Sequence, residues 1–217
     1  MNDSPLILAV DTTSEFGSVA LRRGAETLAE LHIHSPDGFG RVIIQAIQDA
    51  LTKANVRLDQ VDCFASASGP GSFTGVRVGL AVVKGLAEAV NKPVVGISNL
   101  LALSLFGHAP LRGVVLDARR QQVFAAVYDS HGKVVFEESV SVLGEWLKRM
   151  PPETELVGLD SGPFQTAGVP FTAAPKWLAS AVAECAWKIS PSEWRDPVAL
   201  DANYVRRCDA EMFWKDS

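Results

Sequence analysis

The sequence contains few cysteines and no long apolar run. Its three cysteines, Cys63, Cys185 and Cys208, are odd in number and form no Cys-x-x-Cys pair, so they support neither a disulfide framework nor a zinc site. The first apolar run, residues 6–10, is interrupted by Asp11. It is far shorter than the ~20 apolar residues that cross a membrane, and it lacks the basic flank and apolar core of a signal peptide. We therefore expect a cytoplasmic protein with reduced cysteines.

Residues typical of catalytic motifs are scarce. Of four histidines, only His32 and His34 lie close together, at the end of a predicted strand. A solvated strand edge is the favoured interpretation of this pair, and a metal-ligand pair is the alternative. No serine lies in a Gly-x-Ser-x-Gly elbow. Asp11 and Asp117 are either paired carboxylates for acid–base chemistry or, as we favour, acceptors for hydrogen bonds from neighbouring turns.

Basic residues are fewer than acidic residues, 20 against 25. The formal net charge of the 217-residue chain is −5, and affinity for a phosphate backbone depends on Lys and Arg displacing counterions. We expect any contact with nucleic acid to be indirect, through a partner that supplies the basic surface. Four arginines are candidates for binding phosphate in pairs, and surface ion pairs are the alternative for them; they are Arg119, Arg120, Arg206 and Arg207.

The most informative segment that is present runs from Ser68 to Leu80 and joins a buried strand to an apolar helix. Gly69 and Gly71 permit a positive φ or a close backbone approach, and Pro70 fixes φ between them. Ser72 or Thr74 is placed to cap the helix. Because no Gly-Lys-Ser/Thr follows, this loop is not the P-loop that holds nucleotide phosphates.

The order of predicted elements indicates an internal duplication. The first half has strands at 6–10, 18–22 and 27–33, a helix at 41–54, a strand at 61–67, a helix at 74–90 and a strand at 94–97. Strands at 113–116, 123–128 and 134–138 restart the order, and ASASGPGSF (65–73) has a counterpart in VGLDSGPF (157–164). We predict an α/β fold of two βββαβαβ lobes, residues 1–108 and a smaller, degenerate lobe at 109–217. The last helix either stays with the smaller lobe or packs back on the first.

A duplicated βββαβαβ unit is the plan of the actin, sugar kinase and Hsp70 (ASKHA) superfamily. Its first hairpin carries a phosphate loop of the Asp-x-Gly-Thr type. Asp11, Thr12 and Thr13 keep part of that loop, whereas Asp117-Ala118-Arg119-Arg120 has lost it. Asp11, Thr12 and Thr13 are therefore vestigial phosphate-loop candidates, and we expect no cofactor.

Two segments carry a resemblance to a known family. The strings ILAVDTTSEFGSVAL and GPGSFTGVRVGLAVVKGLAEAVNKPVVGIS closely resemble the TsaB (YeaZ) family of bacterial proteins in tRNA threonylcarbamoyladenosine synthesis. The resemblance is strong over residues 6–100. It implies a non-catalytic subunit that binds and stabilises TsaD, as a heterodimer, during threonylcarbamoyl transfer to N6 of adenosine 37 in tRNAs reading ANN codons. The implied wider partners are TsaE, an ATPase, and TsaC, with a possible homodimer when the chain is alone.

The resemblance also bears on metal binding. TsaD carries a His-x-x-x-His metal motif, and Asn99 and Leu103 stand at its two histidine positions here. Leucine cannot ligate a metal. We therefore expect no metal site and no enzymatic activity in this chain.

The predicted helix at 74–90 is apolar nearly all round, so it needs cover on more than one side. The helix at 41–54 of the same lobe or a partner subunit is the candidate for that second cover. Gly75, Gly79 and Gly85 are interpreted as room for a second helix. The predicted partner interface consists of Ile43, Ile47, Val76, Val78, Val82 and Leu86.

The alternative function is a small-molecule ATP-dependent kinase of the same superfamily, with Asp11 contacting the metal–nucleotide. Such a kinase needs a second phosphate loop and a glycine-rich adenosine site. Asp117-Ala118-Arg119 and Asp160-Ser161-Gly162-Pro163 are poor versions of these two features. A metalloprotease is excluded by the missing histidines.

Overall fold

The computed structural model describes residues 4–159 and 162–205. These residues form two compact units. The first comprises the described chain up to Ala102 together with Pro175–Ala202, and the second comprises the described part of Leu103–Ala174 together with residues 203–205. The lobe boundary predicted after residue 108 remains a prediction. The two units differ from the predicted lobes in two segments: residues 103–108 lie in the second unit, and residues 175–202 lie in the first.

The first unit is built on a five-stranded sheet with the order β3-β2-β1-β4-β5. β1 pairs antiparallel with β2 and parallel with β4, β2 pairs antiparallel with β3, and β4 pairs parallel with β5. The strands are β1 (Leu6–Asp11), β2 (Phe16–Arg23), β3 (Glu26–His34), β4 (Cys63–Ala67) and β5 (Val94–Ile97). The helical elements are α1 (Ile43–Lys53), η1 (Leu58–Gln60), α2 (Phe73–Ala89), α6 (Ala179–Lys188), η2 (Pro191–Glu193) and η3 (Pro197–Ala199).

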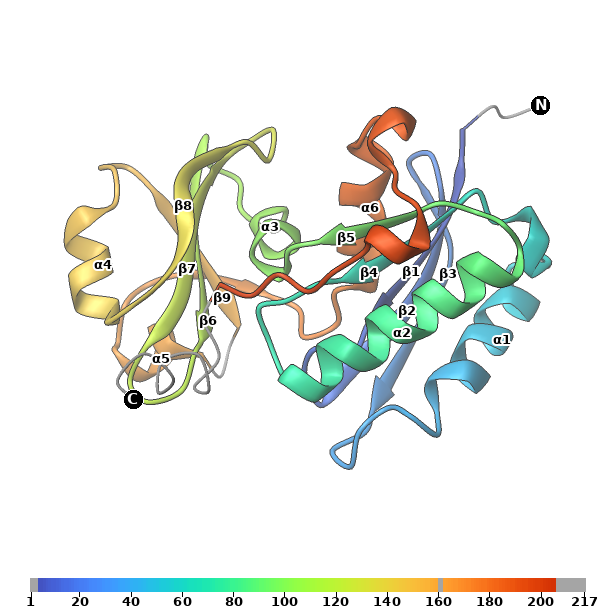
Figure 1. Ribbon diagram of the computed structural model, residues 1–217. Coiled ribbons are helices and arrows are strands. Elements are labelled where there is room, and N and C mark those ends of the chain that lie inside the picture. Colours follow the sequence, from blue (N-terminus) through green and yellow to red (C-terminus); the bar gives the residue numbers. More distant parts are fainter. Residues whose placement is uncertain (1–3, 160–161, 206–217) are drawn as a thin grey trace, which may run out of the picture. The chain divides into compact units, whose positions relative to one another are not determined.

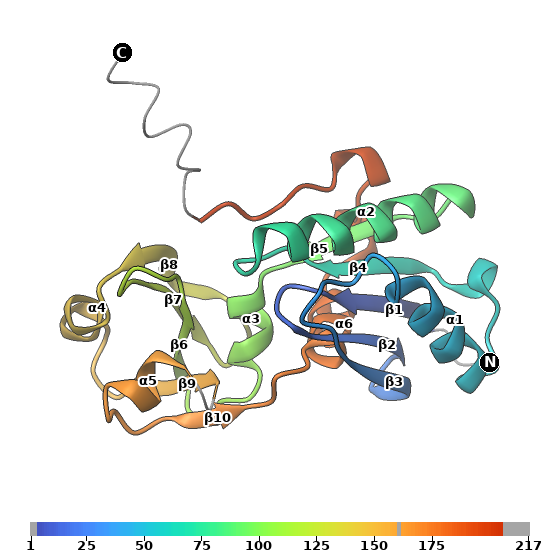
Figure 2. The same cartoon turned by 90° about the horizontal axis from the view of Figure 1, so that it is seen from below.

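Helices cover both faces of this sheet. α1 and α2 lie on one face and α6 lies on the other (Figures 1 and 2). Alternate residues of a strand point to opposite faces, so Leu6, Leu8 and Val10 of β1 enter the core beneath α1 and α2. Each of these two helices contributes a stripe at helical spacing to the same core; the stripes are Ile43, Ala46, Ile47 and Ala50 in α1 and Val76, Leu80, Val83 and Ala87 in α2.

The second unit repeats the arrangement in reduced form. Its sheet has the order β10-β9-β6-β7-β8, with the antiparallel and parallel pairs in the same places. The elements are β6 (Leu111–Asp117), β7 (Val123–Asp129), β8 (Val134–Ser141), α4 (Leu143–Arg149), β9 (Glu155–Leu159), α5 (Pro163–Thr166) and β10 (Thr172–Ala174), and α3 (Asn99–Ser104) spans the boundary between the units. Trp146 of α4 is the largest buried side chain of its core.

The two sheets confirm the predicted fold class. Both follow the order βββαβαβ, and the second differs mainly in its helices, since α5 has four residues where α2 has 17. The predicted strands and the helices at 41–54 and 74–90 match β1–β8, α1 and α2 within a few residues. Ser72 is the N-cap of α2, with its hydroxyl accepting a hydrogen bond from Gly75 N, as predicted.

Candidate functional site

Three loops of the first unit meet at one edge of its sheet. They follow β1, β4 and β5, which run parallel, so their carboxyl ends lie at the same edge. Polar side chains of these loops are almost fully buried, with exposed fractions of 1% for Asp11, 5% for Thr13 and 2% for Asn99. Buried polar groups are stable only when they are hydrogen-bonded, and here they bond to one another.

The hydrogen bonds form a continuous chain across the three loops. The backbone N–H and the hydroxyl of Thr13 both donate to Asp11 Oδ1, over 2.9 and 2.6 Å. Asn99 Nδ2 donates to Thr13 Oγ1 over 2.6 Å, and Asn99 Oδ1 accepts from Gly69 N over 3.0 Å. Donors that a phosphate loop would offer to a ligand are therefore engaged within the protein.

The Asp11 carboxylate also holds the start of α6. It accepts a hydrogen bond from the backbone N–H of Leu178, the residue before that helix. Ala179 N donates to Ser18 Oγ over 2.9 Å, so two N–H groups at this helix end are bonded by residues of β1 and β2. Burial raises the pKa of Asp11, and the hydrogen bonds from Thr13 and Leu178 oppose that rise.

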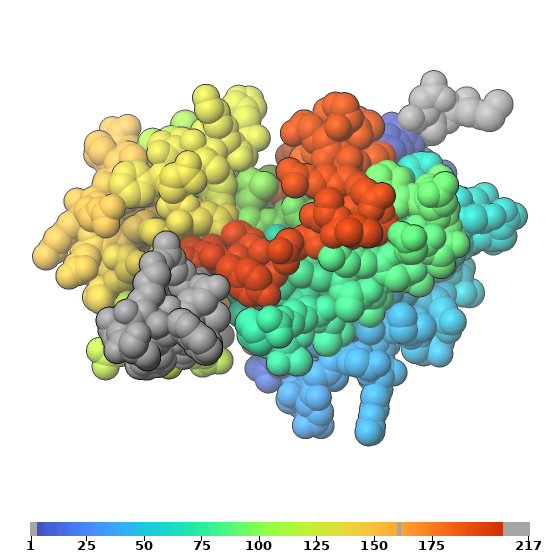
Figure 3. Space-filling model, in the orientation of Figure 1, coloured from blue at the N-terminus to red at the C-terminus, as the bar shows by residue number. Residues whose placement is uncertain are grey.

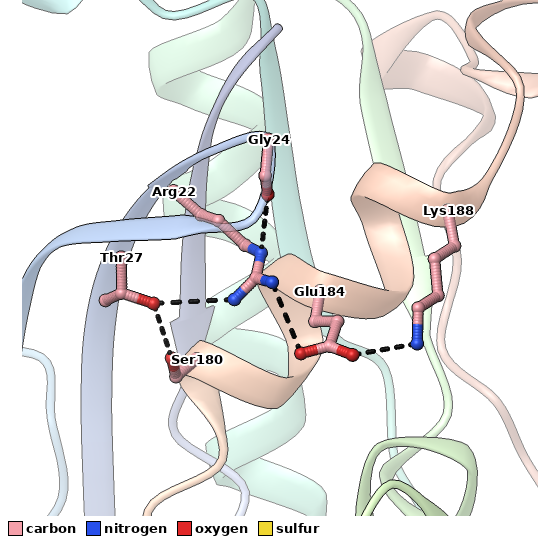
Figure 4. A network of polar contacts seen from close by, with 6 residues as sticks. All are labelled: Arg22, Gly24, Thr27, Ser180, Glu184 and Lys188. Carbon is pink, nitrogen blue, oxygen red and sulfur yellow. Dashed lines mark hydrogen bonds and ion pairs between the residues drawn. The ribbon is translucent and has the colours of Figure 1, made fainter. Parts of the chain in front are cut away.

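A second polar network fastens the middle of α6 to the β2–β3 hairpin (Figure 4). Arg22, which is 8% exposed, donates through Nε to Gly24 O over 2.9 Å and pairs with Glu184 over 3.3 Å. Lys188 pairs with the other oxygen of Glu184 over 2.8 Å. No sequence pattern links Arg22 to Glu184 or Lys188.

The loop after β1, predicted as a vestigial phosphate loop, packs directly against α2. Thr12 Oγ1 donates to Gly75 O over 2.8 Å, and a Cβ on Gly79 would lie 2.7 Å from that hydroxyl oxygen. Gly75 and Gly79 thus give room to the protein's own loop, so interpreting them as space for a second helix was wrong. Only Gly85 of the three has open space where its Cβ would be.

The residues predicted for a partner interface divide into two groups. Ile43, Ile47 and Val76 are at most 5% exposed and belong to the core of the first unit. Val78, Val82 and Leu86 are half-buried and lie at the border of that core. The outer surface of α1 and α2 also exposes Ile44 at 45% and Phe73 at 51%. Figure 3 shows these two helices side by side on one face of the first unit.

The remaining predicted residues are spread over the chain. His32 and His34, on the edge strand β3, are about half exposed and stack on Trp177 and Phe16, at ring distances of 4.3 and 4.8 Å. Leu103 is buried, and in the described chain no three His, Cys, Asp or Glu residues are grouped so as to hold a metal ion. Asp117 is in the β6–β7 hairpin of the second unit.

Four of the residues singled out in the sequence lie where the structure gives no description. Arg206 and Arg207, and the Asp160-Ser161 pair, lie outside the described residues. Within the part of the chain that is described, no helix has the length and apolar character needed to cross a membrane.

Comparison with known proteins decides the family. A family model described as "TsaD: tRNA N6-adenosine threonylcarbamoyltransferase" matches residues 37–181. The Escherichia coli tRNA threonylcarbamoyladenosine biosynthesis protein TsaB is 32% identical, over 65% of this chain and 69% of that protein. The Bacillus subtilis TsaB is 26% identical, over 97% of this chain and 98% of its own length. The chain belongs to the TsaB (YeaZ) family.

A solved structure supports the same family. A Pseudomonas aeruginosa protein described as similar to peptidase YeaZ is 25% identical, has a TM-score of 0.78 and covers 93% of this chain and 100% of its own. The TsaB resemblance of the N-terminal half, predicted from residues 6–100, is thus confirmed for the chain.

Proposed function

We propose that this TsaB-family chain is a non-catalytic subunit in tRNA threonylcarbamoyladenosine biosynthesis. It binds and stabilises a TsaD-type transferase, which moves the threonylcarbamoyl group to N6 of adenosine 37 in tRNAs reading ANN codons. The observation that carries this proposal is the hydrogen bonding of Asn99, the residue that stands at a metal-ligand position of TsaD. Its amide is buried and bonded on both sides, to Thr13 and Gly69, so it is a structural link between loops.

The TsaD-type partner binds the outer face of α1 and α2. On α2 that face combines half-buried Val78, Val82 and Leu86 with the open position at Gly85. Half-buried apolar groups gathered on one helix favour a protein partner, and a missing Cβ lets a second helix approach closely. A second copy of this chain occupies the same face when the partner is absent, about a two-fold axis.

The wider assembly contains the TsaE ATPase, with a functional link to TsaC. Contact with tRNA runs mainly through the partners, because the chain carries a net charge of −5. The alternative, a small-molecule kinase, requires Asp11 to contact a metal–nucleotide. The bonds from Thr13 and Leu178 to that carboxylate favour the structural role instead.

Two measurements test the proposal. Depletion of the protein should remove threonylcarbamoyladenosine from bulk tRNA, as measured by nucleoside mass spectrometry, while the purified chain binds no stoichiometric transition metal and hydrolyses neither ATP nor peptide. Unchanged modification after depletion contradicts the proposal, and so does turnover of ATP or peptide by the purified chain.

The interface is tested by Val82→Glu, because a charge buried in an apolar contact without a partner is costly. The matched control is Val134→Glu on β8 of the second unit, where the valine is 40% exposed. Val82→Glu should abolish co-purification with the TsaD-type protein, and Val134→Glu should not. Equal co-purification of both variants would remove α2 from the interface.

A further inference from the structure

The chain that follows α6 lies along one edge of the first unit's sheet. Residues 190–202, the strap, belong to that unit and carry the short helices η2 and η3. Arg195 N donates to Val94 O over 2.9 Å, and Val94 N donates to Arg195 O over 2.8 Å. The strap thus pairs with β5, the edge strand of the sheet. An edge strand exposes backbone donors and acceptors, and the strap covers part of this one.

One leucine anchors the strap to the unit. Leu200 is 5% exposed and belongs to the same hydrophobic core as the inner residues of α2. Gly96 makes room for it, because a Cβ there would lie only 3.0 Å from Leu200 Cδ1. η3, which Leu200 directly follows, packs against α2. The strap is therefore fixed beside α2, and Figure 3 shows it in orange-red next to that helix in green.

The turn of η3 is preformed by its own residues. Asp196 is the N-cap, with Oδ1 accepting a hydrogen bond from Val198 N over 2.8 Å, and Pro197 occupies the first turn. Ala199 N donates to Asp196 O over 2.9 Å, and Leu200 N donates to Pro197 O over 3.3 Å. Because its start is capped and the residue after it is buried, η3 holds its side chains in fixed positions.

Val198 is the side chain that this turn presents to solvent. It is 83% exposed, the largest exposed fraction among the exposed large apolar side chains of the described residues. A single exposed apolar residue is ordinary on a protein surface. Val198 differs because it is held rigidly beside the helix proposed to bind the partner. A contact that is preformed in this way loses little conformational entropy on binding.

We propose that the strap is a third element of the partner surface, beside α1 and α2, and that Val198 inserts into an apolar site of the TsaD-type partner. This inference rests on the proposed function, in which that partner binds the outer face of α1 and α2. The exposed charges of the strap are mainly acidic, Glu193, Asp196 and Asp201 against Arg195. The partner surface that fits is therefore apolar at its centre and basic around it, and an excess of acidic groups disfavours nucleic acid here.

Val198→Asn tests the contact without changing the charge. Because Val198 is exposed in the isolated chain, the urea unfolding midpoint should not change. Binding of the purified TsaD-type partner should weaken by about tenfold, because a polar amide would be buried in an apolar site. The matched control is Val135→Asn on β8 of the second unit, where the valine is 44% exposed; it should leave binding unchanged. Titration calorimetry measures both variants.

Hydrogen exchange locates the contact independently of any variant. When the full chain binds the partner, the amides of residues 198–200 should exchange about tenfold more slowly, because the partner covers η3. The amides of β7, in the second unit, should keep their exchange rates.

The outcomes separate this inference from the proposed function. If Val198→Asn binds the partner as tightly as the parent while Val82→Glu still abolishes co-purification, the strap lies outside the interface and only this inference fails. If the parent chain does not bind the partner at all, the proposed function fails and this inference fails with it. Slower exchange in η3 that appears only as the concentration of this chain alone is raised would assign the surface to a second copy, which also overturns the proposal.

Discussion

The carbonyl oxygen of Thr12 occupies the space that a side chain on residue 75 would need. An ideal Cβ on Gly75 would lie 2.0 Å from Thr12 O, far inside van der Waals contact, and Thr12 O belongs to the backbone of the loop after β1. Close packing of the N-terminal loop on α2 therefore depends on the absence of a side chain at this position.

Gly75→Ala should consequently destabilise the protein by about 2 kcal/mol or more, because the backbone must move to relieve the clash. The control is Gly85→Ala on the same helix, where nothing lies within 4 Å of the added methyl group. That change should stabilise the chain by up to about 1 kcal/mol through helix propensity. Urea unfolding measures both, and equal stability of the two variants would contradict the packing described.

Asp11 offers a test of the structural role against the kinase alternative. Asp11→Ala leaves the N–H groups of Thr13 and Leu178 without an acceptor, which should cost about 1–3 kcal/mol. Asp11→Asn keeps one acceptor oxygen and removes a buried charge, so it should be much less damaging. Expressed in a depleted strain, Asp11→Asn should restore tRNA modification. A variant that folds normally and fails to restore modification would favour the kinase.

The same residue predicts a pH dependence. Burial raises the pKa of Asp11 in the folded protein above its ordinary value of 3.8, so the folded state binds a proton at pH values where the unfolded state has lost it. The contribution of Asp11 to stability is then smallest at neutral pH and grows as the pH falls through the raised pKa. Relative to Asp11→Asn, the parent should gain stability as the pH is lowered from 7 toward 4. A constant difference would show that the pKa is not raised.

The two buried cysteines should be inert. Burial raises the pKa of Cys63 and of Cys185 to about 12, so at pH 8 the reactive thiolate is present at about one part in ten thousand. In a Cys208→Ser background, which removes the thiol outside the described residues, a thiol reagent should modify no cysteine in the native chain and two after unfolding. Rapid modification of the native chain would place one of them at the surface.

Local patterns predicted the strands and helices well because each depends on neighbours in sequence. The short apolar runs of β1 and β2, the Ser72 cap and the turn at Gly69 and Gly71 are of this kind. Gly69 has φ 100°, a backbone conformation that glycine adopts without steric cost. These features need no knowledge of distant residues.

Features that depend on distant residues were not predictable. The bond from Ala179 to Ser18 spans 161 residues, and no spacing in the sequence links β2 to the start of α6. Helical periodicity also could not distinguish the apolar residues of α2 that face the core from those at its border. The residues on both sides of this helix are apolar, and only the fold shows that Val76 faces the core while Val82 lies at its border.

Gly85 supports the sharpest prediction about the partner. It lies on the exposed side of α2 with no atom within 4 Å of its missing Cβ, so a larger side chain meets nothing in the isolated chain. Gly85→Leu should raise the stability of the chain by up to about 1 kcal/mol, since leucine is the better helix former. If a second helix packs closely here, the same change should weaken binding of the TsaD-type partner by about tenfold or more, because overpacking a close contact costs about 1–3 kcal/mol.

Stability and association then move in opposite directions, which a simple loss of folding cannot produce. Unfolding curves of the isolated chain and titration calorimetry with the purified partner measure the two effects. The matched control is Gly144→Leu in α4 of the second unit, where the missing Cβ also meets nothing within 4 Å; it should leave association unchanged. If Gly85→Leu binds the partner as tightly as the parent does, the helices do not approach each other at this position, and the interface proposed on α2 is wrong.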